Sequence, residues 1–160
     1  IDPIVQVFSL DVGIHGISNV VLGSWILIQA GFHLSERLPW WSFFYILIII
    51  VCSTIIHASV LLLTASVSFW VDNAGTSIPF MVKQVAEYSR FPLSLYPQFL
   101  SNLITWILPF AFTGFIPASF LLGHGKEWLG LVTPLVAFAT FILTRTIFRF
   151  GLHRYESTGH

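Results

Sequence analysis

The feature that most constrains this chain is an unbroken apolar run at residues 41–70, WSFFYILIIIVCSTIIHASVLLLTASVSFW. As a helix this run would be about 45 Å long, whereas the hydrocarbon core of a bilayer is ~30 Å thick. Residues 15–34, 99–122 and 129–148 are further apolar runs of roughly spanning length. None of the runs alternates apolar with polar residues, so the pattern favours helices over the strands of a membrane barrel.

The overall composition also indicates an integral membrane protein. Apolar residues make up 56% of the chain and charged residues 9%, with a mean hydropathy of +0.85. Soluble domains carry about 25% charged residues. The sequence therefore predicts an all-α membrane protein, a polytopic helical bundle that forms one transmembrane domain over residues 1–160. The expected spans are about 15–34, 41–71, 80–96 and/or 99–122, and 129–148.

The segment before the last apolar run is broken by four prolines. Proline removes a backbone donor and interrupts a helix, and non-helical backbone at membrane depth is tolerated only where it is buried in protein or lines a cavity. We therefore expect helix breaks within 91–98 and within 109–117. Either 99–122 crosses once as a kinked helix, or 80–96 enters the membrane and 97–122 re-enters. The residues expected to shape this segment are Pro92, Ser94, Tyr96, Pro97, Pro109, Gly114 and Pro117.

The basic residues at the C-terminal end predict the orientation in the membrane. Arg145, Arg149 and Arg154 crowd the end of the last apolar run, and such clusters favour the cytoplasmic side. With four crossings, both ends of the chain are then cytoplasmic.

Few residues suggest chemistry of their own. His57 is the only histidine in the middle of an apolar run, and a haem held between helices needs two ligands at matched depth. No metal or catalytic residues are assigned, and the P-loop pattern is absent from the sequence. The near-zero net charge gives no indication of a nucleic-acid partner. A haem-binding or other membrane enzyme subunit, and a membrane anchor or assembly protein that transports nothing, remain alternatives.

Four ordered motifs resemble one known family. They are LLTASVSFWV at 62–71, YSRFPLSLYP at 88–97, ITWILPFAFTGFIPASFLLG at 104–123 and GLHRYESTGH at 151–160. Together they resemble the type-2 ABC exporter permeases, in particular a bacterial six-span subgroup with the pattern FW … ARYPLSIYP … LPLAFVxYxPA … GLRRYQSAG. The chain departs from that pattern at Phe91, where the subgroup has Tyr, and at His153, where it has Arg. Neither departure would remove the function.

The resemblance implies a permease subunit without enzymatic activity of its own. Two permease subunits, identical or different, would pair in the bacterial inner membrane, and ABC ATPase subunits beneath them would bind the ATP and Mg²⁺. The chain itself would bind no cofactor. The proline-broken segment would form an extracellular gate. The opening residues resemble the loop between the second and third spans, so we expect the first two spans of a longer chain to precede them. The ATPase-coupling residues in this loop would be Asp2, Gln6, Phe8 and Asp11.

Overall fold

The computed structural model describes residues 14–34, 39–71, 74–89, 91–123 and 128–154. Helices and the turns between them account for these ranges, and no strand occurs within them. The prediction of an all-α protein is therefore confirmed. The chain divides into two units, one ending at Trp40 and one beginning at Trp41. The helix described in the first unit is α2, Ile14–Leu34, whose apolar side chains are largely exposed.

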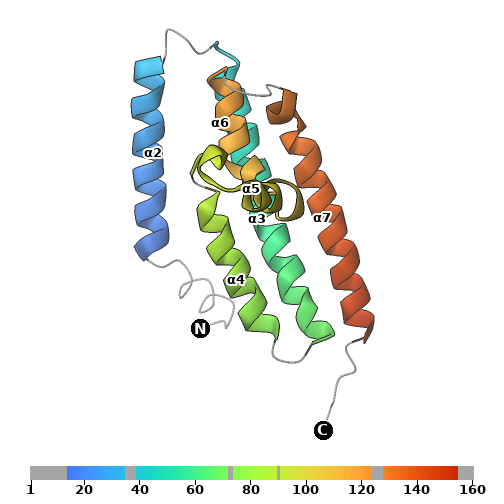
Figure 1. Cartoon of the computed structure of the whole chain (residues 1–160). Coiled ribbons are helices and arrows are strands. Elements are labelled where there is room, and N and C mark those ends of the chain that lie inside the picture. The colour runs from blue at the N-terminus through green and yellow to red at the C-terminus, as the bar shows by residue number, and fades with distance from the viewer. Residues whose placement is uncertain (1–13, 35–38, 72–73, 90, 124–127, 155–160) are drawn as a thin grey trace. The chain divides into compact units, whose positions relative to one another are not determined.

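The second unit is a bundle in which two long helices pack against each other and a chain of short ones packs alongside them (Figure 1). The long helices are α3 (Ser42–Ser66) and α7 (Trp128–Arg154), and both are long and apolar enough to cross a membrane. The shorter elements between them are η1 (Val67–Phe69), α4 (Ala74–Tyr88), η2 (Leu93–Leu95), α5 (Gln98–Asn102), the π-helical η3 (Leu103–Ile107), η4 (Phe110–Thr113) and α6 (Phe115–Leu121).

The two long helices run parallel. Tyr45 near the start of α3 bonds Gly130 near the start of α7, and Ser59 further along α3 bonds Thr144 further along α7. The chain between them must therefore return to the end at which α3 begins. It does so in pieces, first as α4 and last as α6, with the short elements between them at mid-height (Figure 1). The expected breaks within 91–98 and 109–117 are both present.

The polarity of α3 is inverted relative to a helix of a soluble protein. The buried residues of α3 recur every three or four positions and are mostly small or hydroxyl-bearing: Ser42, Tyr45, Ile49, Cys52, Ile56, Ser59, Val60, Thr64 and Ser66. Its exposed face carries bulky apolar side chains such as Phe43, Phe44 and Leu47. In a water-soluble helix the apolar stripe faces inward, whereas close packing of small residues is typical of helix contacts within lipid. This arrangement fits a bundle surrounded by lipid.

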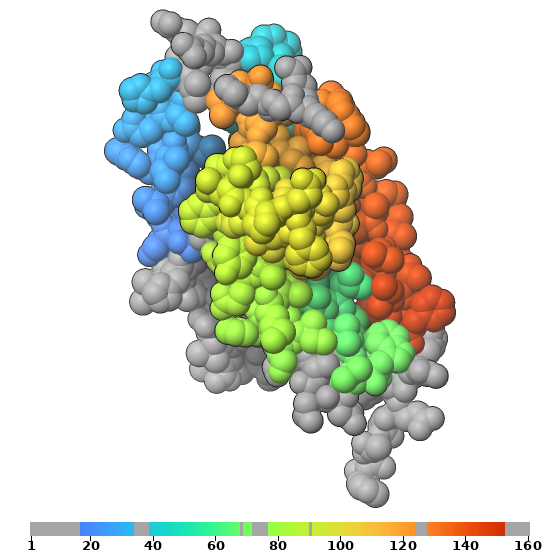
Figure 2. Space-filling model, viewed as in Figure 1, coloured from blue at the N-terminus to red at the C-terminus, as the bar shows by residue number. Residues whose placement is uncertain are grey.

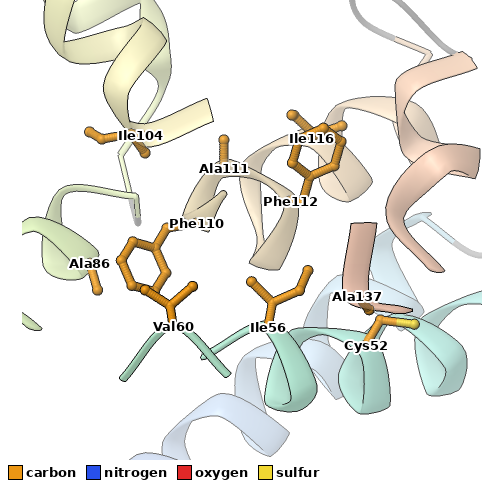
Figure 3. Close-up of a cluster of buried hydrophobic side chains, with 10 residues drawn as sticks. All are labelled: Cys52, Ile56, Val60, Ala86, Ile104, Phe110, Ala111, Phe112, Ile116 and Ala137. Carbon is orange, nitrogen blue, oxygen red and sulfur yellow. The ribbon is translucent and has the colours of Figure 1, made fainter. Parts of the chain in front are cut away.

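The broken segment supplies the centre of the core. Phe110, Ala111 and Phe112 of η4 are 0%, 0% and 1% exposed. Figure 3 shows the Phe110 ring beside Val60 of α3 and the Phe112 ring beside Ile116 of α6, within a cluster that includes side chains from the other helices. The short elements are therefore held by tertiary packing, because none of them is long enough to be stable as an isolated helix.

One helix boundary differs from the sequence-based expectation. The polar stretch VDNAGTSIP at 71–79 predicts a turn that ends the long apolar run, but α4 already begins at Ala74 and runs through Pro79. Val82, Val85 and Ala86 pack against the core. Packing of this face onto α3 overrides the local turn preference, as tertiary contacts commonly do.

Two glycines of α7 mark the places where neighbouring elements come closest. A Cβ at Gly130 would collide with the Cβ of Phe120 and lie 2.9 Å from the Tyr45 hydroxyl. A Cβ at Gly151 would collide with the ring of Phe69, which also packs edge-on against Phe148. Both ends of α7 therefore depend on the absence of a side chain.

We predict that Gly130→Ala destabilises the protein. The added methyl group must displace Phe120 or Tyr45, and overpacking of this kind costs about 1–3 kcal/mol. The melting temperature in detergent should fall by roughly 2–4 °C for each kcal/mol lost. The matched control is Gly31→Ala in α2, where the new Cβ meets nothing within 4 Å. Equal melting temperatures for the two variants would contradict the close contact at Gly130.

Candidate functional site

The proline-broken segment, residues 91–123, is the candidate functional site. Pro92 and Pro97 are exposed and flank η2, whereas Pro109 and Pro117 are buried on either side of η4. The π-helical turn η3 ends directly before Pro109 with a backbone bond from Leu108 N to Leu103 O of 2.8 Å. π-Turns of this kind are uncommon and occur frequently at functional positions. Figure 2 shows the first part of the segment, in yellow, at the surface between α4 in green and α6 in orange.

Hydroxyl groups of α3 bond two backbone carbonyls that have no helical donor. Thr113 ends η4 and lies outside α6, which begins at Phe115. The Thr113 carbonyl accepts a hydrogen bond of 2.8 Å from Ser53 Oγ. The side chains of α3 thereby attach the end of η4 to the long helix.

The same pairing occurs at the start of α7. Pro134 lies inside this helix and has no N–H, so the carbonyl of Gly130, four residues before it, lacks its usual partner. Tyr45 Oη donates to this carbonyl at 3.0 Å, and the bond is buried. An unpaired carbonyl in an apolar interior costs about 1–3 kcal/mol. The Tyr45 hydroxyl thus allows a proline in the middle of a closely packed span.

The expected residues at the exposed end of the segment behave differently from one another. Tyr96 Oη donates to the carbonyl of Tyr88, four residues before Pro92, at 3.1 Å. Ser94 is exposed and makes no hydrogen bond with the described residues. Gly114 joins η4 to α6 at a negative φ of −154°, whereas the positive-φ glycine of the described chain is Gly123 at the end of α6.

A hollow of about 490 Å³ lies beside the bond between α3 and η4. It is lined by Ser53, Thr54, His57, Ala58, Leu61 and Thr113. The ring of His57 lies 5.5 Å from the ring of Phe110, which is fully buried. The imidazole of His57, halfway along a spanning helix, is expected to face a water-filled path or another protein surface rather than lipid. Among the residues that the structure describes, no three histidine, cysteine, aspartate or glutamate side chains gather in a metal-binding group.

The expected ATPase-coupling residues lie outside the described part of the chain. They are Asp2, Gln6, Phe8 and Asp11, and the structure gives no placement for them. Sequence reasoning also missed two residues of the site. Ser53 and Tyr45 could have been found by asking which carbonyls the helix breaks and Pro134 leave without a helical donor, but the helix that supplies the hydroxyl groups is known only from the tertiary structure.

These features define an α-helical integral membrane protein whose last crossings are joined by a buried, discontinuous segment. The model of the family described as "ABC-2 family transporter protein" matches residues 1–159. The chain therefore belongs to this family and is a membrane permease of an ABC transporter. No curated protein and no solved structure matches the chain significantly. The resemblance noted from the four sequence motifs is thus confirmed at the level of the family.

We predict that the effects of Tyr45→Phe and Pro134→Ala are coupled. Tyr45→Phe keeps the ring but leaves the Gly130 carbonyl unpaired, so it should lower the free energy of unfolding by about 1–3 kcal/mol. Pro134→Ala restores an N–H that can bond this carbonyl. In the Pro134→Ala background, Tyr45→Phe should therefore cost much less. Thermal unfolding of all four proteins in detergent gives the coupling energy.

A matched control for this cycle is Thr54→Val. The Thr54 hydroxyl donates only to Ile50 of its own helix at 2.9 Å, so its loss should cost little in either background. If Tyr45→Phe cost the same with and without Pro134, the hydroxyl would not be compensating for the proline.

Proposed function

We propose that this chain is the permease subunit of an ATP-driven exporter, and that the proline-broken segment 91–123 is its gate. The observation that supports this most directly is the discontinuous return between two parallel spanning helices, with its centre fully buried. A plain anchor would need only continuous spans. A segment made of short pieces can be repositioned by rotations at its joints, and the joint at the end of η4 is bonded to α3 through Ser53 and Thr113.

The proposal assigns ATP chemistry to another subunit. The family membership indicates a partnership with an ABC ATPase in general. In our proposal, separate ATPase subunits bind ATP and Mg²⁺ at the cytoplasmic face, and a second permease subunit, identical or different, completes the pathway. The loop that carries Asp2, Gln6, Phe8 and Asp11 transmits closure of the ATPases. The C-terminal end of α7, with Arg145, Arg149 and Arg154, is cytoplasmic, in the bacterial inner membrane.

The hollow beside η4 lies where a gate would act on a substrate path. Ser53 and Thr113, whose hydrogen bond joins α3 to the broken segment, also line it together with His57. Movement of η4 away from α3 would break this bond and change the shape of the hollow. A probe placed in the hollow can therefore detect movement of the gate even when the transported substrate is unknown.

We predict that the prolines at the joints are needed for the conformational cycle. A His57→Cys reporter in a Cys52→Ala background should react with a soluble maleimide at different rates with and without ATP in the reconstituted complex. Pro97→Ala and Pro109→Ala together should reduce this ATP-dependent change by about ten-fold, equivalent to ~1.4 kcal/mol. Expression and co-purification with the ATPase should be unchanged.

The control for this experiment is Pro39→Ala, at an exposed position outside the broken segment. It should leave the ATP-dependent labelling intact. An unaltered response in the double-proline variant would reduce the prolines to structural kinks and would contradict the gate.

We further predict that the opening loop contacts the ATPase. Single cysteines at Asp2, Gln6, Phe8 and Asp11, again in the Cys52→Ala background, should form crosslinks to the ATPase subunit in membranes. Leu122→Cys is the control, because it lies near the start of α7 and hence at the end proposed to be extracellular. Crosslinking only at Leu122, or labelling of the loop cysteines only from outside the cell, would reverse the proposed orientation.

A further inference from the structure

A second groove, distinct from the hollow at His57, runs along the seam between α3 and α7. Its volume is about 490 Å³, and most of its lining is apolar: Ile55, Ala58, Leu62, Phe141, Phe148 and Leu152. The Thr144 hydroxyl, which also lines it, is already used, since it donates to Ser59 O at 2.9 Å. Such a groove suits hydrocarbon better than a polar solute.

Two arginines line one side of this groove. Arg145 and Arg149 are one helical turn apart on α7 and both line it. The same two side chains also line a neighbouring hollow of about 550 Å³, which includes Ile142 and Phe150. The arginine pair therefore lies between two largely apolar depressions.

The charges of this pair have no counter-charge in the described structure. Both side chains are exposed, and neither makes a hydrogen bond or ion pair with the residues that the structure describes. Arg145 precedes Arg154, at the end of α7, by about 14 Å of helix. A charge at that depth in a membrane is costly unless it is neutralised or reaches the interface.

The described residues of this bundle do not supply the missing charge. Glu87 of α4 is the one acidic residue among them, and it lines neither depression. A second copy of this chain, docked on the same face by a two-fold axis, would bring two further arginines against the first pair. Like charges brought together in this way oppose association. An occupant that combines apolar chains with a negative group fits this face best.

We propose that this face binds an anionic phospholipid, whose phosphate lies between Arg145 and Arg149. One acyl chain lies in the groove between α3 and α7, and the other lies in the hollow beside Ile142. Guanidinium groups pair with phosphate oxygens through two parallel hydrogen bonds. The bilayer supplies such a molecule at high local concentration. The bound lipid would pack along the contact between the two parallel long helices.

The test compares lipids on the full chain after removal of its own lipid in a neutral detergent. Dioleoylphosphatidylglycerol should raise the melting temperature by roughly 3 °C more than dioleoylphosphatidylcholine. Mass spectrometry of the intact protein should show retained phosphatidylglycerol. The variant Arg145→Gln/Arg149→Gln should lose both effects, and Arg145→Lys/Arg149→Lys should keep part of them, because an ammonium still pairs with phosphate as a point charge but loses the two parallel hydrogen bonds.

Two matched variants separate the groove from the charge. Leu62→Trp fills the groove and leaves both arginines, so it should also abolish the preference for phosphatidylglycerol. Lys83→Gln removes an exposed cation on α4, outside the groove, and should change nothing. If the glutamine pair fails to fold, the lysine pair and Leu62→Trp still decide the outcome.

Three results would overturn the lipid site. The first is retention of phosphatidylglycerol by the glutamine pair or by Leu62→Trp. The second is equal stabilisation by inorganic phosphate, which would indicate an anion site that needs no acyl chains. The third is an efficient disulfide between Leu62→Cys and Trp25→Cys in membranes, made in the Cys52→Ala background, because α2 would then occupy the groove.

Discussion

The structure depends on supplying partners to the backbone carbonyls that its helix breaks and Pro134 leave without a helical donor. In lipid no water can bond a free carbonyl, so each break in a helix requires a donor from elsewhere in the protein. The carbonyls of Thr113 and Gly130 obtain theirs from Ser53 and Tyr45, both on α3. One continuous helix, α3, therefore holds both the broken segment and the start of α7, where Pro134 interrupts the backbone hydrogen bonds. Displacement of α3 would act on both of them.

The second constraint is the close approach of backbones in a bundle that has no water to drive its helices together. The contact between α3 and α7 is made by small and hydroxyl-bearing residues, with glycines at 130 and 151 where Phe120 and Phe69 come closest. Contacts of this type gain stability from van der Waals packing over a short distance. The bulky apolar side chains on the exposed face of α3 face the lipid, whose hydrocarbon chains match them in polarity.

These two constraints suit a membrane permease. The spanning helices α3 and α7 form a parallel pair held along its length, whereas the elements between them are short and joined at Pro109 and Gly114. The bundle thus places a pair of continuous helices next to a return of the chain that is made of short elements. The hollow at His57 lies at their boundary, and the groove with Arg145 and Arg149 lies on the lengthwise contact between the long helices. The hollow is suited to a transport path that changes shape. The groove is suited to a lipid that stabilises the helix pair.

The sequence alone determined the all-helical class, the membrane environment and the approximate positions of the helix breaks. These depend on local properties: apolar run length, composition and the missing N–H of proline. Its four ordered motifs also determined the family. It did not predict that α4 begins at Ala74, that the left-handed glycine is Gly123, or that Phe110 and Phe112 form the centre of the core. Nor did it reveal the partners of the freed carbonyls. Those outcomes depend on contacts between residues up to 85 positions apart. The parallel arrangement of α3 and α7, which brings Tyr45 to Gly130 and Ser59 to Thr144, was decided only by tertiary packing.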